Sequence, residues 1–330
     1  MKAVDLHCDV LSLRQKLQVR GKDYSLLSNP YHIDLMKLKR GDYLLQCFAV
    51  FVNPHRFPDP HKTALVEIEH FQTMMKQFSD RITQVFSSRD IPDIEGQGKI
   101  CALLTIEGGG DWMENPEELR RYHQIGARIM SFTWNYENRL GYPNIVPDEA
   151  EKKSQNHLED VRGLTPLGFE FLSEMEHLGI IMDVSHLSDA GFRDVCGAAT
   201  RPFIATHSNA RAVSGHVRNL TDDMLKAIAD RGGVTGINYY PDFLDPEENL
   251  QDCHSTLEWM VRHISHIRNV AGIDVIALGS DFDGIFGDLE LTDCSQLPRL
   301  ADALRSHGFT SSEIEKIFHK NALRLFQEIF

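Results

Sequence analysis

The sequence lacks the marks of several classes of protein. Its six cysteines are scattered, with no Cys-x-x-Cys pair, which indicates free thiols in a reducing compartment. Lys and Arg number 34 against 48 Asp and Glu, and the formal charge of −14 argues against a nucleic-acid or anionic-membrane partner. No apolar run reaches the ~18 residues needed to span a bilayer, and no secretory leader precedes the first apolar segment. We therefore expect a cytoplasmic protein.

Short apolar runs alternate with helical patterns along the whole chain. No linker or low-complexity segment interrupts them, so residues 1–330 are interpreted as one domain with ample apolar content for a core. Strands that alternate with helices imply parallel βαβ units, and eight such units predict an α/β fold, a single (β/α)8 TIM-type barrel with long βα loops. The predicted strands are Val4–Asp9, Tyr43–Val52, Ile100–Glu107, Ala127–Trp134, Ile180–His186, Pro202–His207, Gly233–Tyr240 and Val275–Asp281.

The helices between these strands carry recognisable ends. The polar segment Gly141–Arg162 fits none of them and is interpreted as a functional loop after the fourth strand. The predicted helices are Thr63–Ser79, Pro166 to Gly179 after the N-cap Thr165, Asp222–Arg231 after Thr221, Ser255 to Ala271, and a last helix from Ser311 or Ser312 to Phe326.

Polar side chains stand where the predicted strands end. A TIM barrel places catalysis at the C-terminal ends of its strands, so these residues would meet in one cup. Three histidines and three carboxylates among them are sufficient for a two-metal hydrolytic centre. The residues at the strand ends are His7 with Asp9, Asn53, Glu107, Trp134 with Asn135, His186, His207, Asn238 and Asp281.

The first two ligand candidates come from the first and third strands. His7 and Asp9 share a strand face and could chelate one ion, although such a triplet also arises by chance. Glu107 closes a buried apolar strand and needs a cationic partner, because an unpaired buried charge is unfavourable. A metal would supply this partner. The alternative for Glu107 is the capping of a helix after Gly108–Gly110.

Two further histidines end successive strands. His186 and His207 are 21 residues apart, which is one βα unit, so both imidazoles are expected at the same height. A lone histidine at such a place would more often be a packed core residue. Asp281 ends the eighth strand, where a carboxylate can take a proton from the attacking water and pass it to the leaving amine. Asp283 is the competing candidate and is more typical of a loop residue.

Arg218 follows the sixth strand, in the loop before the helix capped by Thr221. A guanidinium beside the cup could hold a substrate carboxylate through two parallel hydrogen bonds. The alternative is a surface arginine near a helix start.

Motifs spread in order over the chain now point to a family. They are His7-x-Asp9, Ile106-Glu107-Gly108-Gly109, Asp183-x-Ser185-His186, Thr206-His207-Ser208, Arg218-Asn219, Gly279-x-Asp281-Phe282-Asp283-Gly284 and Asn321-Ala322-Leu323-Arg324-Leu325-Phe326. Together they resemble the membrane (renal-type) dipeptidases, zinc peptidases of the amidohydrolase superfamily.

The resemblance implies a cofactor of two Zn²⁺ ions per chain. His7 and Asp9 would bind one ion, His186 and His207 the other, and Glu107 would bridge them. Other divalent metals can occupy such a site, since His and carboxylate ligands also take Mn, Co or Fe.

The resemblance also implies a reaction and its partners. The substrates would be small dipeptides, with a D-residue accepted at the C-terminal position. Asp281 would move the proton, and Arg218 would bind the C-terminal carboxylate. The family also suggests a homodimer.

One residue departs from the family pattern. Better-known members carry a histidine near the end of the fourth strand, where it touches substrate, and Trp134 stands at that place here. We therefore expect Trp134 and Asn135 to contact the substrate, with carbonyl polarisation left to Asn135, another group or the metal.

Two other functions compete with this interpretation. A different amidohydrolase would act on another small amide or ester, such as an N-acyl amino acid, but many of those bridge their metals with a carbamylated lysine on the fourth strand. No lysine lies near Trp134, and Glu107 takes that role instead. A barrel that binds metal or ligand without turnover is the second alternative, which the number of catalytic groups disfavours.

Overall fold

A curled parallel sheet forms the centre of the protein, which we describe from a computed structural model for residues 1–145, 162–247 and 249–330. Its strands are β1 (Ala3–Asp5), β2 (Tyr43–Phe51), β3 (Ile82–Gln84), β4 (Ile100–Glu107), β5 (Ala127–Ser131), β6 (Ile181–Asp183), β7 (Thr235–Ile237) and β9 (Ile276–Leu278). They pair in the order β6-β5-β4-β2-β1-β9-β7, and β3 pairs with the first half of β4.

A short extended segment closes the two ends of this sheet. Ile204 forms a parallel bridge with Asp183 of β6, and Ala205 forms one with Thr235 of β7. The segment therefore serves as the sixth barrel strand, and the ring of eight is complete. The predicted (β/α)8 barrel is confirmed. A separate two-stranded sheet joins β8 (His254–Ser255) to β10 (Asp288–Leu289).

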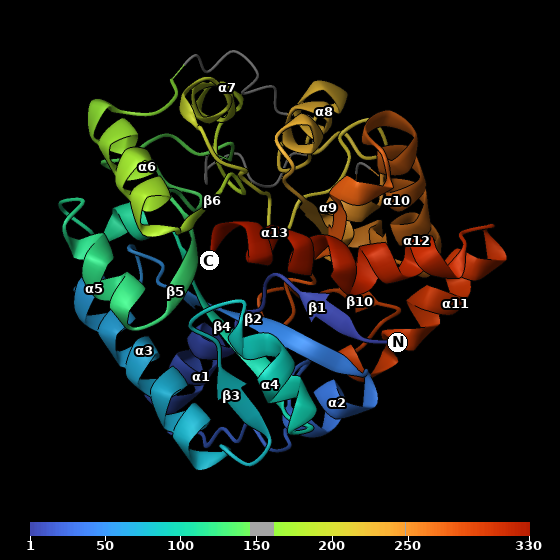
Figure 1. Ribbon diagram of the computed structural model, residues 1–330, viewed down its shortest axis with the longest axis horizontal. Coiled ribbons are helices and arrows are strands. Elements are labelled where there is room, and N and C mark those ends of the chain that lie inside the picture. The colour runs from blue at the N-terminus through green and yellow to red at the C-terminus, as the bar shows by residue number, and fades with distance from the viewer. Residues whose placement is uncertain (146–161, 248) are drawn as a thin grey trace.

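Helices surround the barrel, as Figure 1 shows. Those that follow strands are amphipathic and pack an apolar face against the sheet. The α-helices are α1 (Val10–Val19), α2 (Leu35–Arg40), α3 (Pro60–Gln77), α4 (Asp90–Gly96), α5 (Glu118–Gln124), α6 (Pro166–Leu178), α7 (Asp189–Ala198), α8 (Asp222–Asp230), α9 (Pro241–Leu244), α10 (Leu257–Ala271), α11 (Pro298–Ser306), α12 (Ser311–Glu315) and α13 (Asn321–Ile329). A π-helical turn over Lys316–Lys320 joins α12 to α13.

The last helix closes one end of the barrel. Leu325 and Phe326 of α13 belong to the same buried cluster as Val4, Leu103 and Ile204 from the strands. In Figure 1, α13 (red) crosses the centre of the view over this end. The cluster fills the barrel towards the N-terminal ends of its strands, which leaves the C-terminal ends for polar residues.

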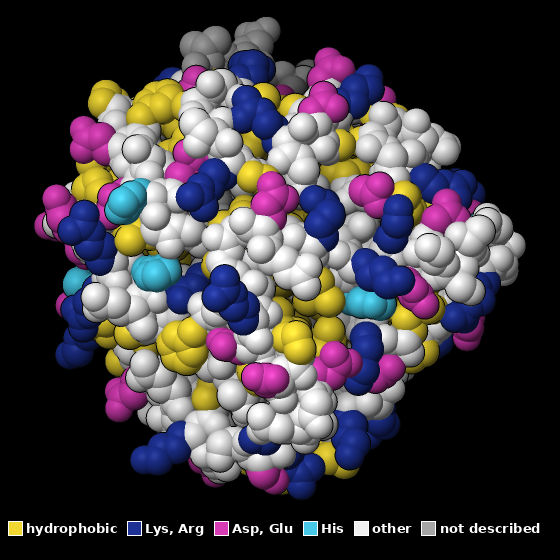
Figure 2. Space-filling model, viewed as in Figure 1, with side chains coloured by type: hydrophobic (Ala, Val, Ile, Leu, Met, Phe, Trp, Pro, Cys, Tyr) yellow, Lys and Arg dark blue, Asp and Glu magenta, His cyan; other side chains and the backbone are white. Residues whose placement is uncertain are grey.

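The surface seen from this side carries mixed charges. Figure 2 shows basic and acidic side chains interspersed over this face. Within the described residues, no helix is both long and apolar enough to cross a membrane.

Most predicted elements are present, with different bounds. The strand over Ile100–Glu107 has the predicted limits, whereas β6 and β9 end three residues before His186 and Asp281. Both of these residues have positive φ, so the backbone leaves the sheet before it reaches them. The predicted extension of these strands to His186 and Asp281 was wrong for this reason.

Helix starts were predicted within three residues, and the largest difference is α3, which begins at Pro60 and not at Thr63. Thr165 and Thr221 cap α6 and α8 as expected. Thr256, and not Ser255, caps α10, because Ser255 pairs in β8. Thr310 caps the last helical segment through a capping box with Glu313. Of the predicted loop Gly141–Arg162, residues 146–161 lie outside the described residues.

Candidate metal centre

The predicted ligands meet at the C-terminal end of the barrel. His7 lies two residues after β1, Glu107 is the last residue of β4, and His186 lies three residues after β6. His207 lies two residues after Ala205 of the sixth barrel strand. All of these side chains are buried, so water does not compensate for their polarity. Their convergence is what the sequence predicted.

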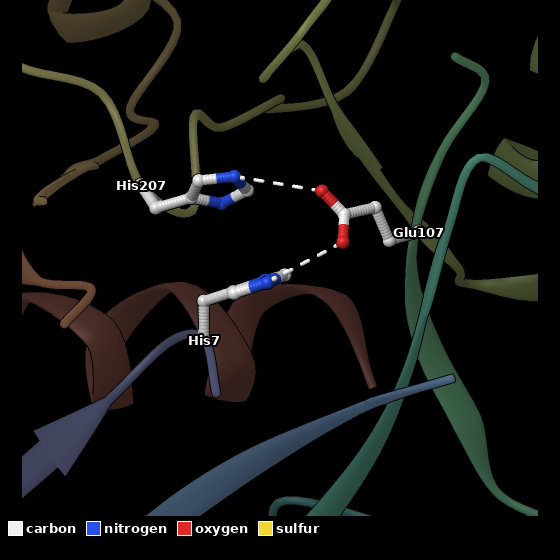
Figure 3. Close-up of side chains that lie close together, drawn as sticks. All are labelled: His7, Glu107 and His207. Atoms are coloured by element: carbon white, nitrogen blue, oxygen red, sulfur yellow. Dashed lines mark ion pairs between the residues drawn. The ribbon is translucent and has the colours of Figure 1, made fainter. Parts of the chain in front are cut away.

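Glu107 lies at the centre of the cluster. Its Oε1 is 2.8 Å from Nε2 of His186 and 3.6 Å from Nε2 of His207, and its Oε2 is 3.6 Å from Nε2 of His7. Figure 3 shows His207 and His7 directed at different oxygens of this carboxylate. The carboxylate can therefore serve two ions at once. The Glu107 side chain does not cap the 3-10 turn that follows. That turn spans Gly109–Asp111, and its N-cap is Gly108, which has a φ of 68°.

A chain of hydrogen bonds orients the His207 ring. The Thr206 hydroxyl donates to Asp183 Oδ2 over 2.6 Å, so its oxygen must accept the 2.7 Å hydrogen bond from Nδ1 of His207. This leaves Nε2 of His207 with a free lone pair directed at Glu107. A carboxylate behind a histidine is the usual support of a metal ligand.

The His186 ring is oriented by Asn135. Asn135 Oδ1 lies 2.9 Å from Nδ1 of His186, so Nδ1 carries the proton and Nε2 has a free lone pair. The Nε2 atoms of His186 and His207 are 3.0 Å apart. Two imidazole lone pairs thus face one oxygen of Glu107, and without a cation only a proton on Glu107, whose pKa burial raises to about 8, can lie between them. Their mutual repulsion would be relieved by a cation.

His7, Asp9 and Asp281 form the other half of the cluster. Nε2 of His7 is 3.5 Å from Asp9 Oδ2 and 3.9 Å from Asp281 Oδ1, and within the described residues it makes no hydrogen bond of ordinary length. Burial lowers the pKa of His7, but the charges of Glu107, Asp9 and Asp281 outweigh it and raise that pKa to about 10. This pocket therefore attracts positive charge.

The remaining pKa values reflect the same field. Burial, and then the charges of Arg218 and His7, hold the pKa of His186 well below its ordinary value. The pKa of His207 is lowered by burial and by the same two cations. Burial raises the pKa of Glu107 to about 8. Neutral imidazoles beside carboxylates are a donor set that binds zinc and similar divalent ions. The residues fit a two-metal centre.

Asp281 is held at the rim of the cluster. Asn238 Nδ2 donates to Asp281 Oδ2 over 2.9 Å, and burial raises the pKa of Asp281 to about 7. Gly284 packs against it so closely that a Cβ would lie 2.8 Å from Asp281 Oδ1 and 2.2 Å from Asp9 Oδ2. A carboxyl with a pKa near neutrality is suited to both accepting and donating a proton.

The competing residue Asp283 points elsewhere. Its Oδ1 accepts a hydrogen bond of 2.8 Å from the backbone N–H of His32, and its N–H donates to Nδ1 of His32 over 2.9 Å. Asp283 does not line the cavity over the cluster. It anchors the loop that carries Asp281, as a loop residue would.

A cavity of about 440 Å³ opens over the cluster. Trp134 and Asn135 line it, as does Phe51, whose ring centroid is 4.9 Å from that of Trp134. Asp9, Glu107, His186 and Asp281 contribute its polar part, and Asn53 also lines it. The volume suits a molecule of dipeptide size.

Arg218 is buried beside the cluster and does not line this cavity. Its Nη1 donates to Ser208 Oγ and its Nη2 to the His207 carbonyl, both over 3.3 Å, and its Nε has no partner. Burial lowers the pKa of Arg218 to about 10, against the opposing effect of Asp281 and Glu107. The alternative of a surface arginine is wrong. A buried guanidinium with two long bonds retains capacity for an anion.

Sequence reasoning assigned no role to the supports of the site. Asp183 and Thr206 lie inside the quoted motifs, three residues before His186 and one before His207. Asn238 was noted at a strand end without a role. All three are polar residues in predicted apolar strands. A buried polar side chain needs a hydrogen-bond partner, and this requirement could have indicated their role.

Comparisons with known proteins identify the family of the chain. The family described as membrane dipeptidase (peptidase family M19) matches residues 1–329. An uncharacterized dipeptidase of Schizosaccharomyces pombe is 30% identical, with 99% of this chain and 80% of the relative covered.

Two solved structures are similar over the full chain. A metallopeptidase from Rhodobacter sphaeroides, liganded with a phosphinate mimic of the dipeptide L-Ala-D-Ala, is 26% identical with a TM-score of 0.87, covering 100% of this chain and 99% of that one. Dipeptidase AC, a metallopeptidase of family M19, is 27% identical with a TM-score of 0.86, covering 100% and 98%.

Proposed function

The chain belongs to the membrane dipeptidase family, and we propose that it hydrolyses dipeptides over two divalent ions, with zinc preferred. It is a metallo-dipeptidase. The observation that carries the two-ion proposal is the convergence of Nε2 of His186 and Nε2 of His207 on Glu107 Oε1. One orphaned ring nitrogen, on His7, faces the other oxygen of Glu107.

Each ion would have its own ligands. His7 and Asp9 would hold one, His186 and His207 the other, and Glu107 would join them through its two oxygens. Two ions are supported because the described residues offer two groups whose ligand atoms lie within 4.8 Å of one another, His7 with Glu107 and His207, and His7 with Asp9 and Asp281. Zinc is the ion that this donor set most commonly takes.

Bound ions of this kind activate water and polarise the carbonyl of the scissile bond. Asp281 would accept the proton of the attacking water and deliver it to the leaving amine. Its raised pKa and its bond from Asn238 support this role, since the carboxyl is held in place and can change its protonation near neutrality.

Arg218 would bind the C-terminal carboxylate of the dipeptide. Two observations support this role: within the described residues Nε of Arg218 has no partner, and its two hydrogen bonds are long. Because Arg218 does not line the cavity, the substrate carboxylate would have to reach it past Ser208. Trp134 and Asn135 would line the substrate pocket, and Asn135 also orients His186. A D-residue at the C-terminal position is part of the proposal, because a mimic of L-Ala-D-Ala occupies the Rhodobacter relative.

An amidohydrolase for N-acyl amino acids is the alternative. It would also use the metals and a carboxylate site, but would require no free amine. The test is an assay of L-Ala-L-Ala, L-Ala-D-Ala, their C-terminal amides and N-acetyl-L-alanine, with metal analysis of the same sample. Hydrolysis of the free dipeptides, with little turnover of the amides or of the N-acyl compound, is expected. Turnover of N-acetyl-L-alanine alone would support the alternative.

Three further assignments stay predictions. The homodimer rests on family resemblance and is tested by sedimentation of the purified protein. The cytoplasmic location and the single domain over residues 1–330 are tested by fractionation and by the cooperativity of unfolding.

A further inference from the structure

Two cations line the cavity outside the metal cluster. Lys16 of α1 and Arg56 of the loop after β2 both border it. The carboxylates that border it are Asp9, Glu107 and Asp281, and all three belong to the cluster. Apart from the Tyr240 phenol, the described wall outside the cluster is therefore apolar, amide or positively charged.

Lys16 makes no ion pair with a described carboxylate, and its charge acts at longer range on Asp9 and Glu67. Its Nζ lies 3.5 Å from Ser12 Oγ, which in turn donates to Asp9 Oδ1 over 3.3 Å. No described carboxylate oxygen lies within 4.0 Å of the ammonium. The side chain is half-buried, so its charge is only partly hydrated. An anionic group in the cavity would complete its coordination.

Arg56 lines the same cavity from the loop after β2. It is exposed, and its guanidinium makes no hydrogen bond or ion pair with the described part of the chain. Its loop is held by Asn53, whose carbonyl accepts from the Arg56 N–H over 3.1 Å. Strands β1 and β2 are neighbours in the sheet, so the two cations approach the cavity from adjacent units.

The barrel order places Arg56 opposite Arg218, and Lys16 on the barrel unit next to that of Arg56. The eight strands follow one another around the barrel in the order β1, β2, β4, β5, β6, Ile204–Ala205, β7 and β9. The strand across the barrel from β2 is therefore the Ile204–Ala205 segment. Arg218 follows that segment and contacts His207, whereas Arg56 follows β2. A dipeptide whose carboxylate lies at Arg218 would cross the metals with its N-terminal residue towards Lys16 and Arg56.

We propose that this enzyme prefers dipeptides whose N-terminal residue carries an acidic side chain, bound by Lys16 and Arg56. The proposal rests on the dipeptidase function proposed above. Aspartate and glutamate present a carboxylate that an ammonium and a guanidinium can both reach through charge-assisted hydrogen bonds. Lys16 and Arg56 are specificity-determining residues in this account and take no part in the chemical step.

The test compares side chains that differ only in charge. For the wild-type enzyme, kcat/KM is measured for L-Glu-L-Ala and for the isosteric L-Gln-L-Ala, with L-Ala-L-Ala as reference. We expect kcat/KM to be about 5–50-fold higher for L-Glu-L-Ala than for L-Gln-L-Ala. This is the range that the free energy of partly exposed, charge-assisted hydrogen bonds predicts. The double variant Lys16→Met, Arg56→Met should bring this ratio near one. The ratio within each protein cancels any general loss of activity.

A control and two outcomes complete the test. Lys22→Met removes a cation that lies after α1 and outside the cavity lining, and should keep the wild-type ratio. Equal rates on L-Glu-L-Ala and L-Gln-L-Ala, with L-Ala-L-Ala well hydrolysed, would overturn the proposal and leave the dipeptidase function intact. Hydrolysis of none of the three would instead contradict the dipeptidase function. If L-Ala-L-Glu were preferred over L-Ala-L-Gln while L-Glu-L-Ala was not preferred over L-Gln-L-Ala, the cations would bind the C-terminal residue. That result would overturn the proposed binding of the N-terminal side chain.

Discussion

The Nε2 atoms of His186 and His207 face each other at 3.0 Å, each with its Nδ1 engaged in another hydrogen bond. Neither nitrogen has a proton to give the other. Such a contact is unfavourable in a buried site unless a cation lies beside it. The orientation of the two rings thus depends on Asn135 and Thr206, which accept hydrogen bonds from their Nδ1 atoms, as well as on a bound cation.

Removal of a support should weaken metal binding without unfolding the protein. Thr206→Val deletes the hydroxyl that accepts from His207 and donates to Asp183. A loss of about 10–100-fold in metal affinity is expected, the usual effect of a lost partner behind a ligand. Affinity is measured by competition with a chromophoric chelator. Thr105→Val is the matched control, because the Thr105 hydroxyl is buried without a partner, and it should keep wild-type affinity. Equal affinities for both variants would contradict the role of Thr206.

Asp281→Asn should retain the metals and lose the proton transfer. We expect kcat to fall by about 10²–10⁴-fold, the span of general acid–base groups, with a changed acidic limb of the pH–rate profile. The comparison variant is Asp283→Asn, which alters a carboxyl that contacts His32 outside the cavity. Near-normal kcat for Asp281→Asn together with an inactive Asp283→Asn would transfer the role to Asp283.

Arg218→Met should weaken recognition of the free C-terminal carboxylate. The loss of charge-assisted hydrogen bonds predicts a decrease in kcat/KM for L-Ala-L-Ala of about 10–150-fold. Most of the preference for the dipeptide over its C-terminal amide should disappear with it. The measurement is the ratio of these two rates in wild type and variant. A ratio that the substitution leaves unchanged would remove Arg218 from substrate binding.

His263 predicts a pH dependence of stability away from the metal centre. It is buried, its Nδ1 accepts from the Ala210 N–H over 3.1 Å, and its Nε2 donates to the Leu244 carbonyl over 2.9 Å. Burial lowers its pKa to about 4, against an unfolded value of about 6.5. The unfolded chain therefore binds this proton first, and stability present above pH 6.5 is lost as the pH falls towards 4.

The free energy of unfolding is expected to decrease by about 3 kcal/mol, because each pH unit between the two pKa values contributes about 1.36 kcal/mol. Urea unfolding at pH 7 and pH 4.5 measures it. His263→Gln can keep both hydrogen bonds without the titration, and should show a smaller decrease. The same decrease in both proteins would assign it to other groups.

The convergence of the candidate metal ligands could be predicted from sequence because it depends on barrel topology. Glu107 ends β4, His186 and His207 follow two or three residues after the ends of two other parallel strands, and the C-terminal ends of such strands meet. The supports could not be predicted as readily. Whether Asn135 faces the substrate or His186 depends on where the chain turns after β5, which is set by packing and not by periodicity.

Arg218 illustrates the same limit. Its place after the sixth strand indicated proximity to the site, but its burial depends on how the Asn209–Leu220 segment folds back. The positive φ of His186 and of Asp281 was also beyond the pattern of apolar residues. Strand ends were predicted too late at these residues because the pattern continues where the sheet has stopped.

The most direct test of this account is the metal content of wild type and of Glu107→Ala. The bridge at Glu107 predicts about two zinc ions per chain in the wild-type protein, and loss of both in the variant, since His7 and His186 share only this carboxylate. Elemental analysis after gel filtration measures the content, with circular dichroism to confirm that the variant is folded. A folded Glu107→Ala protein that retains two ions and wild-type activity would contradict the two-metal centre proposed here.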